Sequence, residues 1–222
     1  MKIIAHIYND FPEKFGIPRQ SGLVKGLTGT IIFEKEYRVR EALEGIEDFS
    51  HLWLIWQFSE NLRDNWSPTV RPPRLGGEKR KGVFATRSPF RPNPVGLSCV
   101  KLEEVRHTDK YGTVLIVSGI DLMNGTPIYD IKPYIAYCDS VPEASEGFAR
   151  DVKDYELKVN FDDCLLKKIP EDKQKALIGI LKQDPRPAYH NDSERIYGVK
   201  FADFDIKFKV DKDVLTVVDV LS

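Results

Sequence analysis

The chain has 222 residues and a formal net charge of −1, and 41% of its residues are hydrophobic. It is therefore long enough for one large domain or two smaller ones with a sizeable core. Its three cysteines, Cys99, Cys138 and Cys164, are odd in number and lack CxxC spacing. This pattern argues against a disulfide framework and for free thiols in the reducing cytoplasm.

The sequence predicts no membrane span, no signal peptide and no structural metal site. No apolar run approaches the roughly 20 residues of a membrane span, and residues 1–10 are too short and too soon interrupted for a signal peptide. The four histidines show no spacing typical of a zinc site. We expect a cytoplasmic protein without a structural metal.

The first 161 residues of the chain are rich in predicted strands. These segments contain many β-branched and aromatic residues and are bounded by Gly, Pro, Asn or Asp; they cover residues 3–8, 29–33, 51–58, 94–105, 111–120, 128–137 and 155–161. One helix is predicted over 39–46. Because the strands follow one another without the helical crossovers of a parallel sheet, an antiparallel barrel or sandwich is favoured over a doubly wound fold.

The composition changes after about Ser140 to acidic and small residues, which end the first unit. A helix-start signal at Pro170 and apolar residues at helical spacing predict a short helix to about Lys182. Strands are predicted over 195–201, 204–210 and 214–221. We therefore expect a mainly β fold with a barrel domain over residues 1–140, a connecting segment over 141–163 and a small α+β domain over 164–222.

A loop over residues 82–98 has the composition of a binding site. Its prolines fix backbone angles, so the loop should hold Arg87, Arg91 and Asn93 in set directions. Guanidinium groups held in this way suit carboxylate, phosphate or nucleotide ligands. Glu78 is the one acid within a basic stretch that contains Arg71, Arg74, Lys79, Arg80, Lys81, Arg87 and Arg91.

Three other segments have compositions that fit either a binding site or a structural role. Pro18-Arg19-Gln20 lies in a polar connection after the first strand, and residues 121–134 combine a common hairpin turn, Asn124-Gly125, with a high density of polar groups. Residues 184–189 are expected to form a stiff loop with one acid, one base and one phenol, for which a structural turn is favoured when the six residues are taken alone. The two tryptophans of the third strand, Trp53 and Trp56, are interpreted as core.

Several common enzyme motifs are absent from the sequence. No GxGxxG follows a strand and opens a helix, so a dinucleotide site or a doubly wound methyltransferase has no anchor. A P-loop and a GxSxG motif are also absent.

Five segments, in order, closely resemble the TsaA-like family: residues 14–20, 49–53, 70–77, 82–98 and 121–134. Residues 184–189 and the terminal strands resemble the C-terminal domain of its bacterial members, so the resemblance covers nearly the whole chain. It implies a small antiparallel β-barrel that binds S-adenosylmethionine, usually as a homodimer with the cofactor near the subunit interface. The implied reaction is methyl transfer to N6 of threonylcarbamoyladenosine in tRNA, next to the anticodon.

The resemblance also implies site residues. Matching positions for cofactor binding are Pro18, Arg19, Gln20, Ser59, Glu60, Arg91, Asp121, Leu122, Met123, Asn124, Gly125 and Thr126. Asn124 stands where the family commonly has Asp. Residues expected to bind tRNA are Arg71, Arg74, Arg87 and Asn93, since basic groups position phosphates. Candidate catalytic residues are Arg91 and Arg186, as positive charges for the threonylcarbamoyl group, and Asp184 and Tyr189, as proton carriers.

Two alternatives stay open at this stage. A non-catalytic RNA-binding or S-adenosylmethionine-binding barrel would use the same basic loop. A barrel enzyme acting on a small anionic metabolite would use the arginines for that substrate and would be indifferent to tRNA.

Overall fold

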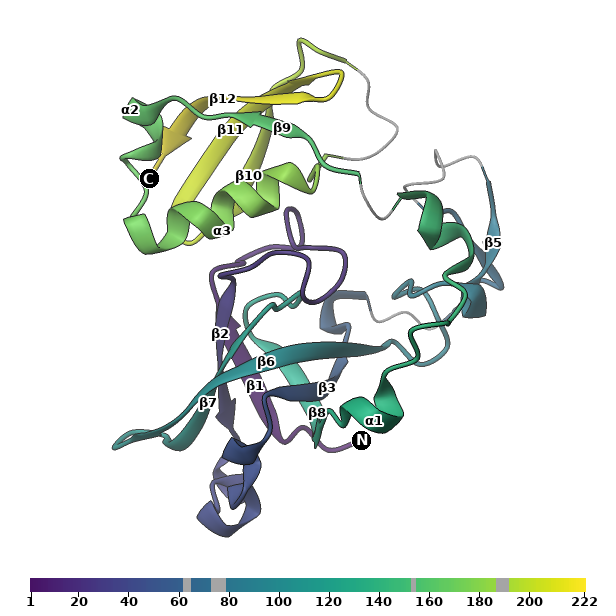
Figure 1. The fold of residues 1–222 in the computed structure, drawn as a ribbon, viewed down its shortest axis with the longest axis vertical. Helices are drawn as coiled ribbons and strands as arrows, with labels where there is room; N and C mark the ends of the chain where they lie inside the picture. Colours follow the sequence, from purple (N-terminus) through teal and green to yellow (C-terminus); the bar gives the residue numbers. More distant parts are fainter. Residues whose placement is uncertain (62–64, 73–78, 153–154, 187–191) are drawn as a thin grey trace.

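The protein folds around a closed six-stranded barrel (Figure 1). The computed structural model describes residues 1–61, 65–72, 79–152, 155–186 and 192–222. The barrel order is β1-β2-β7-β6-β3-β8, and every neighbouring pair is antiparallel. Its strands are β1 (Ala5–Asn9), β2 (Thr28–Phe33), β3 (His51–Gln57), β6 (Val95–Thr108), β7 (Gly112–Ser118) and β8 (Thr126–Pro133). The predicted antiparallel barrel is confirmed.

Alternation along β3 fills the barrel interior. Leu52, Leu54 and Trp56 are buried, as expected for a strand with period-two patterning. Trp53 instead points outward, where its indole Nε1 donates to Asp139 over 3.0 Å. That carboxylate belongs to a single helical turn, α1 (Ala136–Asp139). The prediction of a core role is right for Trp56 and wrong for Trp53.

The helix predicted over residues 39–46 does not form. Two 3₁₀ turns, η2 (Arg40–Leu43) and η3 (Ile46–Asp48), take its place after η1 (Lys35–Tyr37). Gly45 lies between them with φ of 81°, a left-handed conformation that ends a right-handed helix.

The turn at Asn124-Gly125 is not part of a hairpin. In the barrel, β7 pairs with β2 and β6, whereas β8 pairs with β1 and β3. The segment between β7 and β8 is therefore a crossing connection, held by the end of β1: the N–H of Gly125 donates to the carbonyl of Ile7 over 2.8 Å.

A second sheet forms the C-terminal unit, in the order β10-β11-β12-β9. The predicted helix is α3 (Glu171–Lys182), and the predicted terminal strands are β10 (Tyr197–Phe201), β11 (Phe204–Asp211) and β12 (Val214–Leu221). The strand β9 (Lys158–Asn160) pairs in parallel with β12, and the short helix α2 (Asp163–Leu166) follows it. The C-terminal sheet thus takes one strand from the stretch predicted as a connection.

Short elements lie near the basic stretch and in the connecting segment over residues 141–163. They are η4 (Ser59–Asn61), β4 (Thr69–Val70), β5 (Lys81–Gly82), η6 (Val83–Ala85) and η7 (Gly147–Val152). The pair β4–β5 lies away from the barrel strands (Figure 1). We call residues 65–72 and 79–87 the arm.

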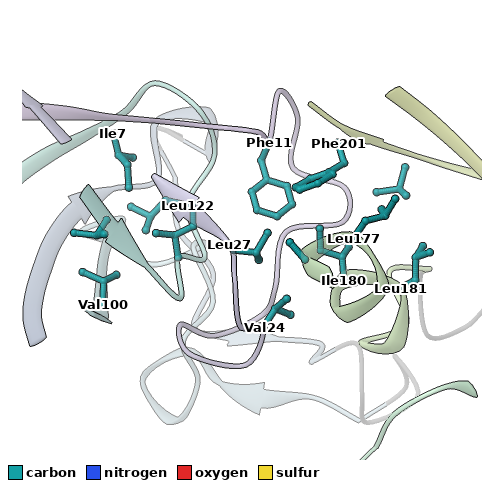
Figure 2. Packing of buried hydrophobic residues seen from close by; sticks show 14 of the residues in the cluster. Ile7, Phe11, Val24, Leu27, Val100, Leu122, Leu177, Ile180, Leu181 and Phe201 are labelled. Carbon is teal, nitrogen blue, oxygen red and sulfur yellow. The ribbon is translucent and has the colours of Figure 1, made fainter. Parts of the chain in front are cut away.

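The segment between β1 and β2, residues 10–27, joins the two units. Phe11 lies against Phe201 of β10, with ring centroids 5.6 Å apart, and the N–H of Ala202 donates to the carbonyl of Asp10 over 2.8 Å. Figure 2 shows the buried apolar side chains continuing from Ile7 in the barrel to Leu181 of α3. Because one core spans both units, the segment between β1 and β2 is fixed on both sides.

Candidate functional site

Two predicted cofactor segments, far apart in sequence, lie side by side. The N–H of Gly22, just after Pro18-Arg19-Gln20, donates to the carbonyl of Gly119 over 2.8 Å. Ser21 Oγ accepts from the N–H of Cys99 on β6 over 3.1 Å. The segment that carries Pro18-Arg19-Gln20 therefore borders the connection that begins at Gly119.

The connection over residues 121–126 is shaped by the end of β1. Asn124 Oδ1 accepts from the N–H of Asn9 over 3.0 Å, and Asn9 Nδ2 donates to the carbonyl of Leu122 over 2.9 Å. An aspartate at position 124 would offer the same acceptor oxygen, so the replacement by Asn keeps this turn. Leu122 and Thr126 are buried, and Thr126 Oγ1 bonds the carbonyl of Met123. Their side chains stabilise the loop, whereas Asn124 and Gly125 are exposed.

Asp121 is the ionisable group of this connection. Ser98 Oγ donates to its Oδ1 over 2.5 Å. Burial raises the pKa of Asp121 to about 6, against the opposing effects of the Ser98 hydrogen bond and the Arg87 charge. Arg87 in turn donates from Nη1 to Gln20 Oε1. Arg87, predicted as a tRNA ligand, thus lies with the predicted cofactor residues.

Arg91 and Asn93 are held within their own loop. Arg91 Nη1 donates to the carbonyl of Thr86 over 3.0 Å, and the carbonyl of Asn93 accepts from Val95 over 2.7 Å. Arg91 is partly exposed and Asn93 exposed. The guanidinium of Arg91 therefore has a partner within its own loop, and the rigidity expected of this loop stays a prediction.

Ser59 and Glu60 lie at the end of β3, in η4. The carbonyl of Glu60 accepts from Lys14 Nζ over 3.0 Å. Lys14 belongs to the segment between β1 and β2, so η4 is tied to the same region as Pro18 and Arg19.

A pocket of about 120 Å³ opens between the two units. One wall is the segment from Lys14 to Arg19, and the other includes Asp184 and Pro185, just after α3. The pocket therefore brings the predicted cofactor residues Pro18 and Arg19 together with the predicted catalytic residue Asp184. We call it the junction pocket.

One residue that lines this pocket, Asp184, belongs to a buried ion pair. Arg186 Nε donates to Asp184 Oδ1 over 3.0 Å, with the two side chains 10% and 9% exposed. Although burial opposes the charge of Arg186, its hydrogen bond to Asp184 raises the guanidinium pKa. Tyr155 OH donates to Asp184 Oδ2 over 2.9 Å, and burial together with this carboxylate raises the pKa of Tyr155. Sequence reasoning missed Tyr155, because no local pattern links it to a residue 29 positions later.

The arm carries basic and aromatic groups outside the barrel. Arg71 is exposed, and Arg80 Nη1 donates to Thr69 Oγ1 over 3.1 Å. Trp66 and Phe84 are 50% and 71% exposed, and their ring centroids lie 6.0 Å apart. The predicted residues Arg74 and Tyr189 lie outside the described residues.

Among the described residues, no group of three or more His, Cys, Asp and Glu side chains could hold a metal ion. No helix in the same part of the chain is long and apolar enough to cross a membrane.

The fold defines a barrel protein with a pocket at its junction with an α+β unit. The family model of the tRNA-methyltransferase O N-terminal domain matches residues 6–140, and that of the TrmO C-terminal domain matches residues 154–222. The chain belongs to the tRNA-methyltransferase O (TrmO) family, which confirms the resemblance noted from its motifs.

Named relatives agree with this assignment. The chain is 41% identical to the tRNA (adenine(37)-N6)-methyltransferase of Escherichia coli, over 93% of this chain and 91% of that protein. It is 40% identical to a putative S-adenosylmethionine-dependent methyltransferase, RcsF, of Pseudomonas aeruginosa, over 98% and 95% of the two chains. A crystal structure of TrmO from Pseudomonas aeruginosa matches with a TM-score of 0.78 and 35% identity, over 99% of this chain and 97% of that one.

Proposed function

We propose that this protein transfers the methyl group of S-adenosylmethionine to N6 of adenine 37 in tRNA, next to the anticodon, on an adenosine that already carries a threonylcarbamoyl group. Relatives named as adenine-37 N6-methyltransferases support the reaction. One structural observation carries the proposal for this chain: Pro18 and Arg19 of the barrel and Asp184 of the C-terminal unit line a single pocket.

The chemistry of the barrel-side residues fits S-adenosylmethionine. Asp121 offers a partly buried carboxylate to a cationic ligand, and Gln20 and Arg87 add an amide and a guanidinium beside it. Asn124 and Gly125, in the same 121–126 connection as Asp121, are exposed. The cofactor supplies an activated methyl group together with its own leaving group, so the protein has mainly to position the acceptor and exclude water.

The acceptor nitrogen is the harder partner for the protein. A ureido-like N–H is a poor nucleophile, and stabilising a partly deprotonated nitrogen would help the transfer. We assign Arg91 and Arg186 as the positive charges that face the threonylcarbamoyl group. Asp184 or Tyr189 would take or relay the proton of the acceptor nitrogen. Because Asp184 and Arg186 are paired and mostly buried, they act as one unit, with Tyr155 holding the carboxylate.

We assign tRNA binding to the arm and to the loop that follows it. Arg71, Arg74 and Asn93 would contact the RNA backbone, and Arg87 would link the RNA side of the site to the cofactor side. The exposed rings of Trp66 and Phe84 support this assignment, because unstacked bases of an anticodon loop stack on aromatic side chains.

The protein would act in the cytoplasm, where its tRNA substrate is modified, and as a homodimer with the cofactor near the subunit interface. Light scattering of the purified chain checks the dimer, and a monomeric mass under assay conditions would contradict it.

The direct test is methylation of two tRNA preparations, one with threonylcarbamoyladenosine and one without, followed by mass spectrometry of the nucleosides. We expect methylation of the modified tRNA alone, and equal methylation of both would contradict the acceptor. S-adenosylmethionine at about 100 times its Kd should also stabilise the protein by about 2.7 kcal/mol. If S-adenosylmethionine gives no binding heat and does not raise the Tm, a non-catalytic RNA-binding barrel is favoured instead.

A further inference from the structure

A line of polar side chains runs from β3 through the neighbouring strand β6 to the loop after β7. Trp56 Nε1 donates to Ser98 Oγ over 2.9 Å, and Ser98 Oγ donates to Asp121 Oδ1 over 2.5 Å. Ser98 has no exposed surface, and Trp56 is 6% exposed. These two residues therefore connect the interior of the barrel to the one carboxylate of the 121–126 connection.

The order of donors and acceptors in this line fixes the direction of the Ser98 hydroxyl hydrogen. Because its oxygen accepts from the indole of Trp56, its single hydrogen is directed to Asp121. A buried hydroxyl is unfavourable without partners, and an apolar residue of similar size would meet the packing needs of this position. We therefore relate these hydrogen bonds to the position and charge of Asp121, and not to the packing of the core.

We propose that Ser98, oriented by Trp56, is a positioning residue that holds the Asp121 carboxylate in place and in its charged form for a cationic group of the cofactor. The proposal rests on the proposed function, since it takes S-adenosylmethionine as the ligand of Asp121. Ser98 ends the matching segment 82–98, but neither Ser98 nor Trp56 is among the site residues that the family resemblance implies, and neither would touch the ligand itself.

The electrostatics of Asp121 give the proposal a measurable signature. Burial raises its pKa to about 6, whereas the Ser98 hydrogen bond, the backbone N–H groups of Asp121 and Ser21, and the Arg87 charge lower it. Arg87 is the charged side chain that faces this carboxylate among the described residues. The carboxylate is thus mostly charged at pH 7 and is neutralised as pH falls through about 6. Affinity for a cationic ligand should fall over the same range.

Removal of the Ser98 hydroxyl should move that fall to higher pH, because the hydrogen bond favours the charged carboxylate. The experiment is calorimetric titration of S-adenosylmethionine from pH 5 to pH 8 with wild type, Ser98→Ala and Ser118→Ala. Ser118 is a matched control in the same barrel, since its Oγ also donates to a carboxylate, that of Glu103. The ligand is the same throughout, so its own ionisation cancels between variants.

We expect the midpoint of affinity loss near pH 6 for wild type and Ser118→Ala, and a midpoint higher by about half a pH unit or more for Ser98→Ala. Because Asp121 would still be largely charged at pH 7, the shift alone should raise the Kd of Ser98→Ala by less than about twofold there, and a larger rise would report the lost positioning of the carboxylate. If Ser98→Ala does not fold, Ser98→Cys replaces it, and its weak S–H donor should still leave the midpoint above that of wild type.

The outcomes separate the two proposals. No binding by wild type at any pH overturns the proposed cofactor site, and this inference with it. Binding by wild type with an unshifted midpoint in the Ser98 variant overturns the role of Ser98 and leaves the proposed function standing. A weaker but equally pH-dependent affinity means that Ser98 is structural only, which also overturns the inference.

Discussion

Arg87 and Arg91 stand four positions apart in one loop, yet their guanidinium groups have different partners. Arg87 reaches the amide of Gln20 and lowers the pKa of Asp121, whereas Arg91 bonds the carbonyl of Thr86 in its own loop. The neighbouring arginine, and not Arg91, is therefore tied to the other predicted cofactor segments. Arg91 fits a role on the acceptor side.

Arg91→Ala should lower the turnover of modified tRNA at least tenfold, about 1.4 kcal/mol of transition-state stabilisation, because the acceptor loses a positioned positive charge. The lost bond to Thr86 should reduce the free energy of unfolding by only about 1 kcal/mol. Arg80→Ala is the control, since Arg80 also bonds a threonine oxygen. It should leave kcat unchanged at saturating tRNA. Wild-type kcat in a folded Arg91→Ala protein contradicts the assignment.

Among the elements, the end of α3 and the residues after it gather the buried charges of the C-terminal unit. Asp184 has a positive φ of 51° and turns the chain directly after the helix, which brings its carboxylate to Tyr155 and Arg186. A buried pair of this kind is costly to break, because one charge is left without its partner.

Asp184→Asn should therefore lower the free energy of unfolding by about 3 to 5 kcal/mol. Asp205→Asn is a matched control in the same unit, because Asp205 pairs with Lys207 at a partly exposed position. It should cost less than about 1 kcal/mol. Urea unfolding of the two variants checks the difference, and equal losses would show that burial does not decide the strength of these pairs.

Tyr155→Phe removes the phenolic donor to Asp184 while keeping the ring. Stability should fall by about 1 kcal/mol, and turnover should fall more than affinity for S-adenosylmethionine, since Tyr155 bonds Asp184, which we propose acts on the acceptor. Steady-state kinetics with modified tRNA, together with calorimetry, measure both. A variant that loses cofactor affinity but keeps kcat would place Tyr155 on the cofactor side.

On the scale of the whole molecule, the barrel and the C-terminal unit share one core through the segment between β1 and β2. That segment also carries Pro18, Arg19 and Gln20. Phe201→Ala should lower the free energy of unfolding by about 3 to 5 kcal/mol and should also weaken S-adenosylmethionine binding, because Phe11 loses its partner.

Phe33→Ala serves as the control for Phe201→Ala. Phe33 is a buried phenylalanine of β2, at the end of the strand away from this segment, so its loss should reduce stability without changing cofactor affinity in the folded protein. Calorimetry at a temperature where both variants are folded makes the comparison. If the two variants bind equally well, the C-terminal unit does not support the cofactor segment.

Local patterns were sufficient for most strands. The alternation of Leu52, Leu54 and Trp56 specifies a half-buried strand, whereas the rigidity expected from the prolines beside Arg91 stays a prediction. The order of strands in the barrel was not available from such patterns, since β7 leads to a strand that is not its neighbour. The Ser98–Asp121 and Tyr155–Asp184 contacts join residues 23 and 29 positions apart. Such contacts leave no periodic signal in one sequence.

The approach of the two units depends on two positions without side chains. A Cβ at Gly16, where φ is 93°, would lie 2.2 Å from Val199 Cγ2, and one at Gly179 would lie 2.6 Å from Val24 Cγ1. Either added carbon would act as a wedge between the barrel and the C-terminal unit. Gly16 itself lines the junction pocket. The width of that pocket thus depends on atoms that are absent, and replacement of either glycine by alanine should change the separation of the two walls.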